Sequence, residues 1–202
     1  RVRGLPDVER MWFDLRIDDL HTTETDMIAI LPDEMLPDSV EFPEWLTVHA
    51  SLLGTIKKPS VNTAITSDLG SIYLQARLDL DSLSESQGYD GSLKLNELQL
   101  GKLIGQPKTI GALTMEASIK GTGTSMNNIR ASVKSTVHSI VYQDYSYENL
   151  ELVGTIEKYL FSGKASMKDP NLDFDFEADA DYNKDIPSYN LVLAVRNIDL
   201  QK

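Results

Sequence analysis

The sequence predicts an all-β protein built as an elongated, curled antiparallel repeat sheet with one or two short helices. Three observations predict this fold class. Apolar and polar residues alternate with a period of two along much of the chain, as in half-buried strands. Turn-forming stretches separate the alternating segments at roughly 8 to 12 residues, the spacing of an all-β meander. The chain also repeats itself at a fixed offset, which is typical of stacked units that share one core.

The alternation is clearest in residues 72–80 and 172–180. In the first, Ile72 and Leu74 fall on one face and Tyr73 and Gln75 on the other, and residues 172–180 repeat the pattern with Asp and Glu on the polar face. The strongest predicted strands are 11–17, 46–52, 72–80, 113–119, 129–137, 172–180 and 191–195. With the weaker segments between them, we expect roughly eleven or twelve strands.

Turns and helices complete the predicted elements. Residues 57–60, 67–70, 169–171 and 182–185 contain the Gly, Pro, Asn and Asp residues of tight turns. Two segments have a helical pattern instead: residues 23–31, which begin with Thr and Asp and precede Pro32, and residues 98–105, which precede Pro107. We expect both helices to be about two turns long.

An internal repeat defines the organisation of the chain. At an offset of 100 residues, Leu52, Gly54, Thr55, Ile56 and Lys58 recur as Leu152, Gly154, Thr155, Ile156 and Lys158, and the register continues without a gap. This predicts sub-repeats at approximately 46–102 and 146–202. At an offset of 67, residues 46–55 resemble 113–122, and 15–20, 93–98 and 193–198 resemble one another. Because the chain begins at Arg1 rather than Met, we expect residues 1–202 to be one internal β-repeat segment of a longer protein.

Composition excludes several function classes. The net charge of −12 would repel a phosphate backbone, so nucleic acid is not an expected partner. The absence of cysteine removes disulfides, thiolate nucleophiles and Cys-based zinc sites. No apolar run approaches the roughly 20 residues of a membrane-spanning helix.

No residue pattern indicates catalysis, a metal or a cofactor. The histidines His21, His49 and His138 have no companion at metal-ligand spacing. The acidic run from 173 to 181 has the residue type of a calcium site or a glycosidase pair, but a solvated strand face explains it more simply. Gly121-Thr122-Gly123-Thr124 lacks the Lys and the helix of a phosphate loop, and no Ser lies in a hydrolase elbow. We therefore expect a non-enzymatic protein.

The apolar face of the sheet is the predicted site. A dozen strands at about 4.8 Å each would extend roughly 55 Å, so the sheet must curl into a groove or acquire a second layer. Under the first alternative the groove is lined by Ile72, Leu74, Leu78, Leu172, Phe174, Phe176, Leu191, Leu193 and Val195. Under the second, these side chains are the packed core of a β-sandwich, such as an extracellular binding or adhesin module.

The serial order of several motifs resembles the TamB and AsmA-like envelope proteins of Gram-negative bacteria, in the form typical of Bacteroides relatives. The motifs are the Tyr-rich segment 145–156, then Phe161-Ser162-Gly163-Lys164-Ala165, then Asp169-Pro170-Asn171 followed by another strand. Gly4-Leu5-Pro6 and the segment from Leu31-Pro32 to Phe42-Pro43 are also similar to these proteins.

The resemblance implies a place and a role. Such proteins are anchored in the inner membrane by an N-terminal helix and cross the periplasm as a long curled β-sheet. Their groove is thought to pass phospholipid acyl chains towards the outer membrane, and TamB itself acts with a partner of the TamA/BamA type in outer-membrane protein assembly. Both the anchor and the partner-binding module would lie outside this segment, so the resemblance leaves lipid transport and protein assembly as alternatives.

Overall fold

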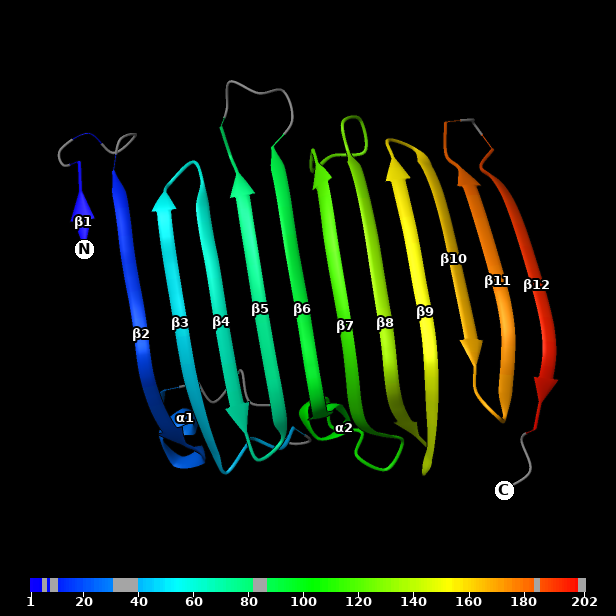
Figure 1. Cartoon of the computed structure of the whole chain (residues 1–202), viewed down its shortest axis with the longest axis horizontal. Helices are drawn as coiled ribbons and strands as arrows, with labels where there is room; N and C mark the ends of the chain where they lie inside the picture. Colours follow the sequence, from blue (N-terminus) through cyan, green and yellow to red (C-terminus); the bar gives the residue numbers. More distant parts are fainter. Residues whose placement is uncertain (5–6, 8–10, 31–39, 82–86, 184–185, 200–202) are drawn as a thin grey trace.

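The computed structural model describes residues 1–4, 7, 11–30, 40–81, 87–183 and 186–199. The strands of these residues form one antiparallel sheet in which each strand pairs with its neighbours in the sequence (Figure 1). The strands are β1 (Val2–Arg3), β2 (Trp12–Thr23), β3 (Trp45–Thr55), β4 (Pro59–Ser67), β5 (Gly70–Asp79), β6 (Gly88–Gln99), β7 (Ile110–Thr122), β8 (Arg130–Tyr142), β9 (Tyr145–Glu157), β10 (Leu160–Lys168), β11 (Leu172–Asp181) and β12 (Ser188–Ile198). The predicted all-β, antiparallel fold class is confirmed.

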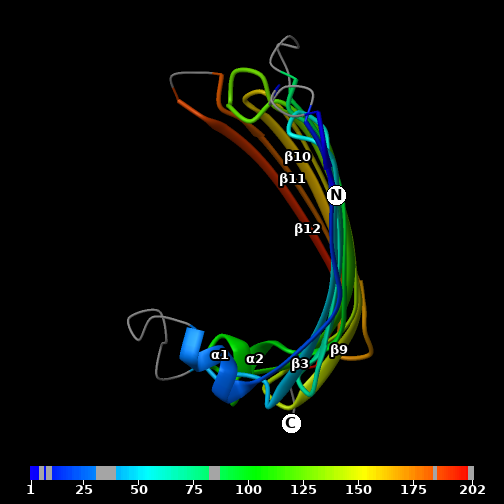
Figure 2. The same cartoon turned by 90° about the vertical axis from the view of Figure 1, so that its left-hand side faces the viewer.

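The sheet is open, with β1 and β12 at its opposite ends. The predicted curl of the sheet from edge to edge is not present, because the strand order runs from β1 to β12 without the two edges turning towards each other. Instead, Figure 2 shows the strands bowed along their length, which gives the sheet a concave and a convex face. The structure therefore has the open form expected for a groove, and within the described residues no second sheet covers it as in a sandwich.

The two predicted helices are present, and both lie on the concave side at one end of the strands (Figure 2). Helix α1 spans Glu24–Ile30 and α2 spans Leu100–Leu103. The second helix is shorter than predicted because Leu98 and Gln99 remain in β6, where they pair with Leu113 and Ala112.

β-Bulges explain the resemblance among residues 15–20, 93–98 and 193–198. In residues 93–98 two polar residues interrupt the alternation, so a regular strand would put Leu98 and Leu95 on opposite faces. The structure inserts one extra residue there, because Leu95 pairs with Met115 and Leu98 with Leu113. The equivalent shift occurs between 17 and 20 in β2 and between 195 and 198 in β12. The three similar segments are thus one bulge motif, which keeps their apolar residues on one face of the sheet.

The sequence repeat at an offset of 100 residues corresponds to two equivalent series of four strands. The series β3, β4, β5 and β6 lies within residues 45–99, and β9, β10, β11 and β12 lie at corresponding positions within 145–198. The last strand of each series carries the bulge motif at the same place, 95–98 and 195–198.

Little of the molecule is enclosed. The one cluster of buried hydrophobic side chains among the described residues comprises Leu95, Leu98, Leu113 and Val137, with Leu100 and Leu103 of α2 packed against it. The accessible surface is 13583 Å², whereas a compact protein of 22.5 kDa would expose about 9,500 Å². The excess follows from a single-layer sheet that leaves most of one apolar face uncovered.

Candidate functional site

A continuous row of apolar side chains crosses the sheet from β2 to β12. Each member is the direct cross-strand partner of the next, so all of them point to the same face. This first row is Leu20, Val48, Ile65, Ile72, Leu95, Met115, Val137, Leu150, Met167, Phe174 and Val195. With about 4.8 Å between strands, the row is roughly 48 Å long.

Two parallel rows extend this surface along the strands. The second row is Ile17, Ala50, Thr63, Leu74, Leu93, Ala117, Ser135, Leu152, Ala165, Phe176 and Leu193. The third row is Leu15, Leu52, Val61, Ala76, Gly91, Ile119, Val133, Gly154, Gly163, Ala178 and Leu191. None of the three rows contains Asp, Glu, Lys or Arg. We call these three rows the apolar gutter.

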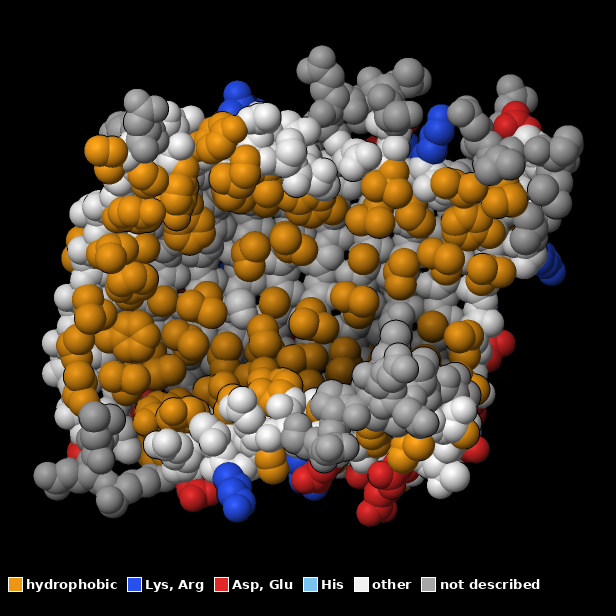
Figure 3. All heavy atoms as spheres, turned by 180° about the vertical axis from the view of Figure 1, so that it is seen from behind, with side chains coloured by type: hydrophobic (Ala, Val, Ile, Leu, Met, Phe, Trp, Pro, Cys, Tyr) orange, Lys and Arg blue, Asp and Glu red, His pale blue; other side chains and the backbone are white. Residues whose placement is uncertain are grey.

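The apolar gutter is the concave face of the sheet. Helix α2, which lies on the concave side in Figure 2, packs its Leu100 and Leu103 against the buried cluster, to which Leu95 and Val137 of the gutter belong. Figure 3 views the molecule from this side and shows hydrophobic side chains spread across the hollow. Many remain open to solvent: Leu74 is 39% exposed and Leu193 is 62% exposed.

The opposite, convex face is polar and carries paired charges. Lys94 contacts Glu116 at 2.8 Å, and Lys164 contacts Glu177 at 2.6 Å, in each case across neighbouring strands. The hydrogen bond to Glu116 and its charge raise the pKa of Lys94, and the same hydrogen bond lowers the pKa of Glu116. The two faces therefore separate charge from hydrocarbon across a single layer of backbone.

All nine predicted lining residues lie on the gutter face. Seven belong to the three rows, and the other two continue them, because Leu172 pairs with Ile198 and Leu78 pairs with Tyr89. Sequence reasoning did not select the lining residues of β7 to β10, such as Met115, Val137 and Met167. The alternation in 113–119 and 129–137 contains the signal that would have identified the first two.

Two glycines make room for aromatic rings on the concave face. A Cβ atom on Gly163 would lie 2.9 Å from the ring of Phe161, and one on Gly121 would lie 2.7 Å from the ring of Tyr89. Tyr89 and Gly121 are direct cross-strand partners. The absence of a side chain on each glycine thus makes room for a ring, which covers exposed backbone with hydrocarbon.

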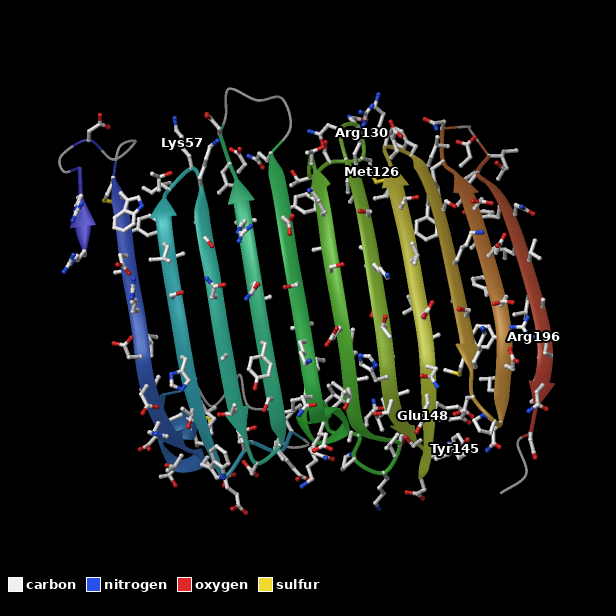
Figure 4. All side chains as sticks on the ribbon, in the orientation of Figure 1. Lys57, Met126, Arg130, Tyr145, Glu148 and Arg196 are labelled. Atoms are coloured by element: carbon white, nitrogen blue, oxygen red, sulfur yellow. The ribbon has the colours of Figure 1, made fainter. Side chains whose placement is uncertain are left out.

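The Asp-Pro-Asn segment has a structural role. Asp169, which is 5% exposed, accepts hydrogen bonds from the Tyr145 hydroxyl at 2.8 Å and from the backbone N–H groups of Glu148 at 3.0 Å and Asn171 at 2.8 Å. Figure 4 shows Tyr145 and Glu148 at the start of β9. The hydrogen bond to Asp169 raises the pKa of Tyr145 to about 12. The carboxylate therefore fixes the β10–β11 turn to β9.

Local hydrogen bonds and ion pairs hold His21 and part of the acidic run. His21 shares a hydrogen bond of 2.8 Å with the Thr47 hydroxyl. In the acidic run, Asp173 and Asp175 contact Arg196 (Figure 4). Among the described residues, no group of three or more His, Cys, Asp or Glu side chains could hold a metal ion.

Comparisons of the chain with protein families, with curated proteins and with solved structures found no match. In the part of the chain that the structure describes, neither helix is long and apolar enough to cross a membrane.

Proposed function

We propose that this chain is a non-enzymatic lipid-carrying segment, in which the apolar gutter solvates the acyl chains of phospholipids. The observation that carries the proposal is the continuity of the gutter: three uncharged rows run side by side across all the long strands. Each CH₂ group removed from water contributes about 0.8 kcal/mol. An acyl chain lying on this surface therefore gains free energy without any polar recognition.

The form of the gutter favours movement along it rather than capture at one point. Its contacts are hydrocarbon against hydrocarbon and recur from strand to strand, so neighbouring positions of an acyl chain are nearly equal in energy. The open side leaves space for a headgroup in water. A directional site would instead need placed polar groups, and within the three rows only Thr63 and Ser135 carry hydroxyl groups.

This role agrees with the resemblance to TamB and AsmA-like proteins. We propose that the parent protein is anchored in the inner membrane, crosses the periplasm and passes phospholipid towards the outer membrane. A partner of the TamA/BamA type would act through regions outside residues 1–202.

Site-specific photocrosslinking tests the proposal with a matched pair of neighbouring residues. Leu193 is 62% exposed on the concave face, and Val192 is 52% exposed on the convex face, where it pairs with Glu177. A benzophenone amino acid at position 193 should crosslink phospholipid from vesicles, detected by mass spectrometry, and the same amino acid at position 192 should not. Equal labelling at both positions, or none at 193, would contradict the proposal.

Charge substitution in the gutter gives a second readout. Phe174→Asp and Leu74→Asp should abolish lipid crosslinking from position 193 or from nearby gutter positions, because a carboxylate beside the acyl chain must be desolvated. Both sites are on an open face, so circular dichroism should still report a folded sheet. Wholesale unfolding would indicate instead that these residues are a packed core.

A further inference from the structure

The edge strand β12 is the counterpart of the interior strand β6. At the offset of 100 residues, Tyr89, Leu93 and Leu95 of β6 correspond to Tyr189, Leu193 and Val195 of β12. The two strands also carry the bulge at the same position, since Leu95 and Leu98 are separated by one extra residue and so are Val195 and Ile198.

The two strands differ in what covers them. Leu95 is 8% and Leu98 is 6% exposed, whereas their counterparts Val195 and Ile198 are 44% and 56% exposed. In the interior, β6 pairs with β7 and contacts Leu113 of that strand within the buried cluster. In the part of the chain described by the structure, β12 has a paired strand on one side only, β11. The apolar residues that β7 and α2 cover at β6 are thus repeated, uncovered, at β12.

The pairing of β6 with β7 defines what a partner of β12 needs. Leu113, Met115 and Ala117 of β7 stand opposite Leu98, Leu95 and Leu93, and Gly121 lies under the ring of Tyr89. The exposed Tyr189 has the same place in β12 as Tyr89 in β6. Strand β3 repeats the pattern of β7 at the offset of 67, with Leu46, Val48, Ala50 and Gly54. The chain therefore contains two versions of one strand type.

We propose that the outer edge of β12 is an acceptor site for an extended polypeptide strand of the β7 type, which adds antiparallel to the sheet. The register follows from β6 and β7: Leu opposite Ile198, Met or Val opposite Val195, Ala opposite Leu193, and Gly opposite Tyr189. Main-chain hydrogen bonds supply affinity, and the alternate side chains supply specificity. The added strand extends the apolar gutter, because its apolar residues continue the first and second rows.

One position distinguishes the acceptor edge of β12 from its interior template. Leu191 stands in β12 where β6 has Gly91, and Gly91 pairs with Ile119 of β7. A large residue opposite Leu191 would meet a second large side chain where the β6–β7 pair has none. Such a residue would add a cross-strand contact of the kind that Leu15 and Leu52 make in the same row.

A peptide experiment tests the proposal on the intact chain. A fluorescein-labelled peptide of residues 110–122 should bind the protein by anisotropy and should slow amide hydrogen exchange selectively in 188–198. Replacing Ile119 by Ala in the peptide should weaken binding, because the apolar contact with Leu191 is lost. Gly121→Val in the peptide should weaken binding by about three- to tenfold, because the valine side chain would fill the space that the Tyr189 ring needs. The peptide of β8, residues 130–142, is the control of equal length. Both peptides are compared at about 0.5 M salt, because the β8 peptide carries Arg130 and Lys134 and no acidic residue, and salt screens its attraction to an acidic protein.

Proline substitution locates the bound peptide on the edge. Successive backbone N–H groups of a strand point to opposite sides, so one of Leu191→Pro and Val192→Pro removes an outward donor. One of these two variants should lose peptide binding while circular dichroism stays unchanged. Equal binding of the β8 peptide, or protection outside β12, overturns the proposal. Dimerisation of the protein through 188–198 that the peptide cannot displace also overturns it, because the occupant is then a second copy.

Discussion

At the scale of single residues, Asp169 joins segments that are distant in the sequence. Its carboxylate accepts hydrogen bonds from the Tyr145 hydroxyl and from two backbone N–H groups, one in β9 and one in its own turn. A buried acceptor with several donors is costly to remove, because each donor is then left without a partner away from water.

Asp169→Asn should therefore destabilise the fold by about 1–3 kcal/mol, since the amide nitrogen would face one of the present donors. Urea unfolding followed by circular dichroism measures the loss. Asp179→Asn is the control, because Asp179 is exposed on the convex face of the same hairpin. An equal loss in both variants would mean that charge, and not the hydrogen-bond geometry at Asp169, is responsible.

Arg196 gives the fold an acid-sensitive interaction. Its guanidinium contacts Asp175 at 2.5 Å and Asp173 at 2.7 Å. The hydrogen bond from Arg196 lowers the pKa of Asp175 below its ordinary value of 3.8, although partial desolvation acts in the opposite direction. A carboxyl with a lowered pKa in the folded state stabilises that state above the unfolded pKa, and this contribution is lost as the pH falls through the folded pKa.

Arg196→Gln should consequently be less stable than the unmodified protein at pH 7, and the difference should shrink as the pH falls below about 4. Urea unfolding at a series of pH values tests this. Lys134→Gln removes a charge from the same face without touching the Asp175 pair and should show no such convergence. A gap between the proteins that stays constant down to pH 2 would show that Arg196 acts through packing alone.

At the scale of elements, α2 docks on the sheet through a glycine. A Cβ atom on Gly101 would lie 1.7 Å from the carbonyl oxygen of Ile110 at the start of β7, a distance that no side chain can occupy. The backbone of Gly101 also accepts a hydrogen bond from the N–H of Gln106 at 2.6 Å. The close approach places Leu100 and Leu103 on the buried cluster.

Gly101→Ala should thus force α2 away from β7 and cost about 1–3 kcal/mol or more. Gly91→Ala is a suitable control, because its new Cβ would make contacts of 3.4 and 3.6 Å, which are close to ordinary. Thermal unfolding of both variants distinguishes them. If Gly101→Ala is as stable as Gly91→Ala, the helix is not held by this contact.

The positions of the β-bulges could be predicted from the sequence only in part. The resemblance among 15–20, 93–98 and 193–198 was detectable by self-comparison, but its meaning was not. Alternation assigns Leu98 to the face opposite Leu95, and only the pairing of both residues with β7 returns them to one face. Whether a strand carries an extra residue depends on its partner strand, which a local pattern does not specify.

At the scale of the whole molecule, stability should vary along the sheet. Each strand packs mainly against its sequence neighbours, so the protein is quasi-one-dimensional, as repeat proteins are. The buried cluster lies in β6, β7 and β8, whereas every residue of β12 is exposed.

Native-state hydrogen exchange should therefore show the greatest protection in β6 to β8 and the least in β12. Mass spectrometry of peptic fragments resolves these segments. Uniform protection along the chain would mean that the sheet unfolds as one cooperative unit, against this expectation. The control is a series of denaturant concentrations. The difference in protection between strands should persist at low denaturant and disappear only near the midpoint of global unfolding, where all strands exchange together.

The sequence by itself determined which side chains share a face within each regular stretch of strand, where most turns fall and which strands correspond. These features are local or repetitive: an alternation of period two places Ile72 with Leu74 and Phe174 with Phe176 whatever lies above them. Only the tertiary structure decided that this face is an open concave gutter. The same alternation builds a covered sandwich core, and the two forms differ solely in whether a second layer packs there. The same holds for Asp169, whose partner Tyr145 comes from another strand. Such contacts arise from the packing of distant segments, which no local pattern encodes.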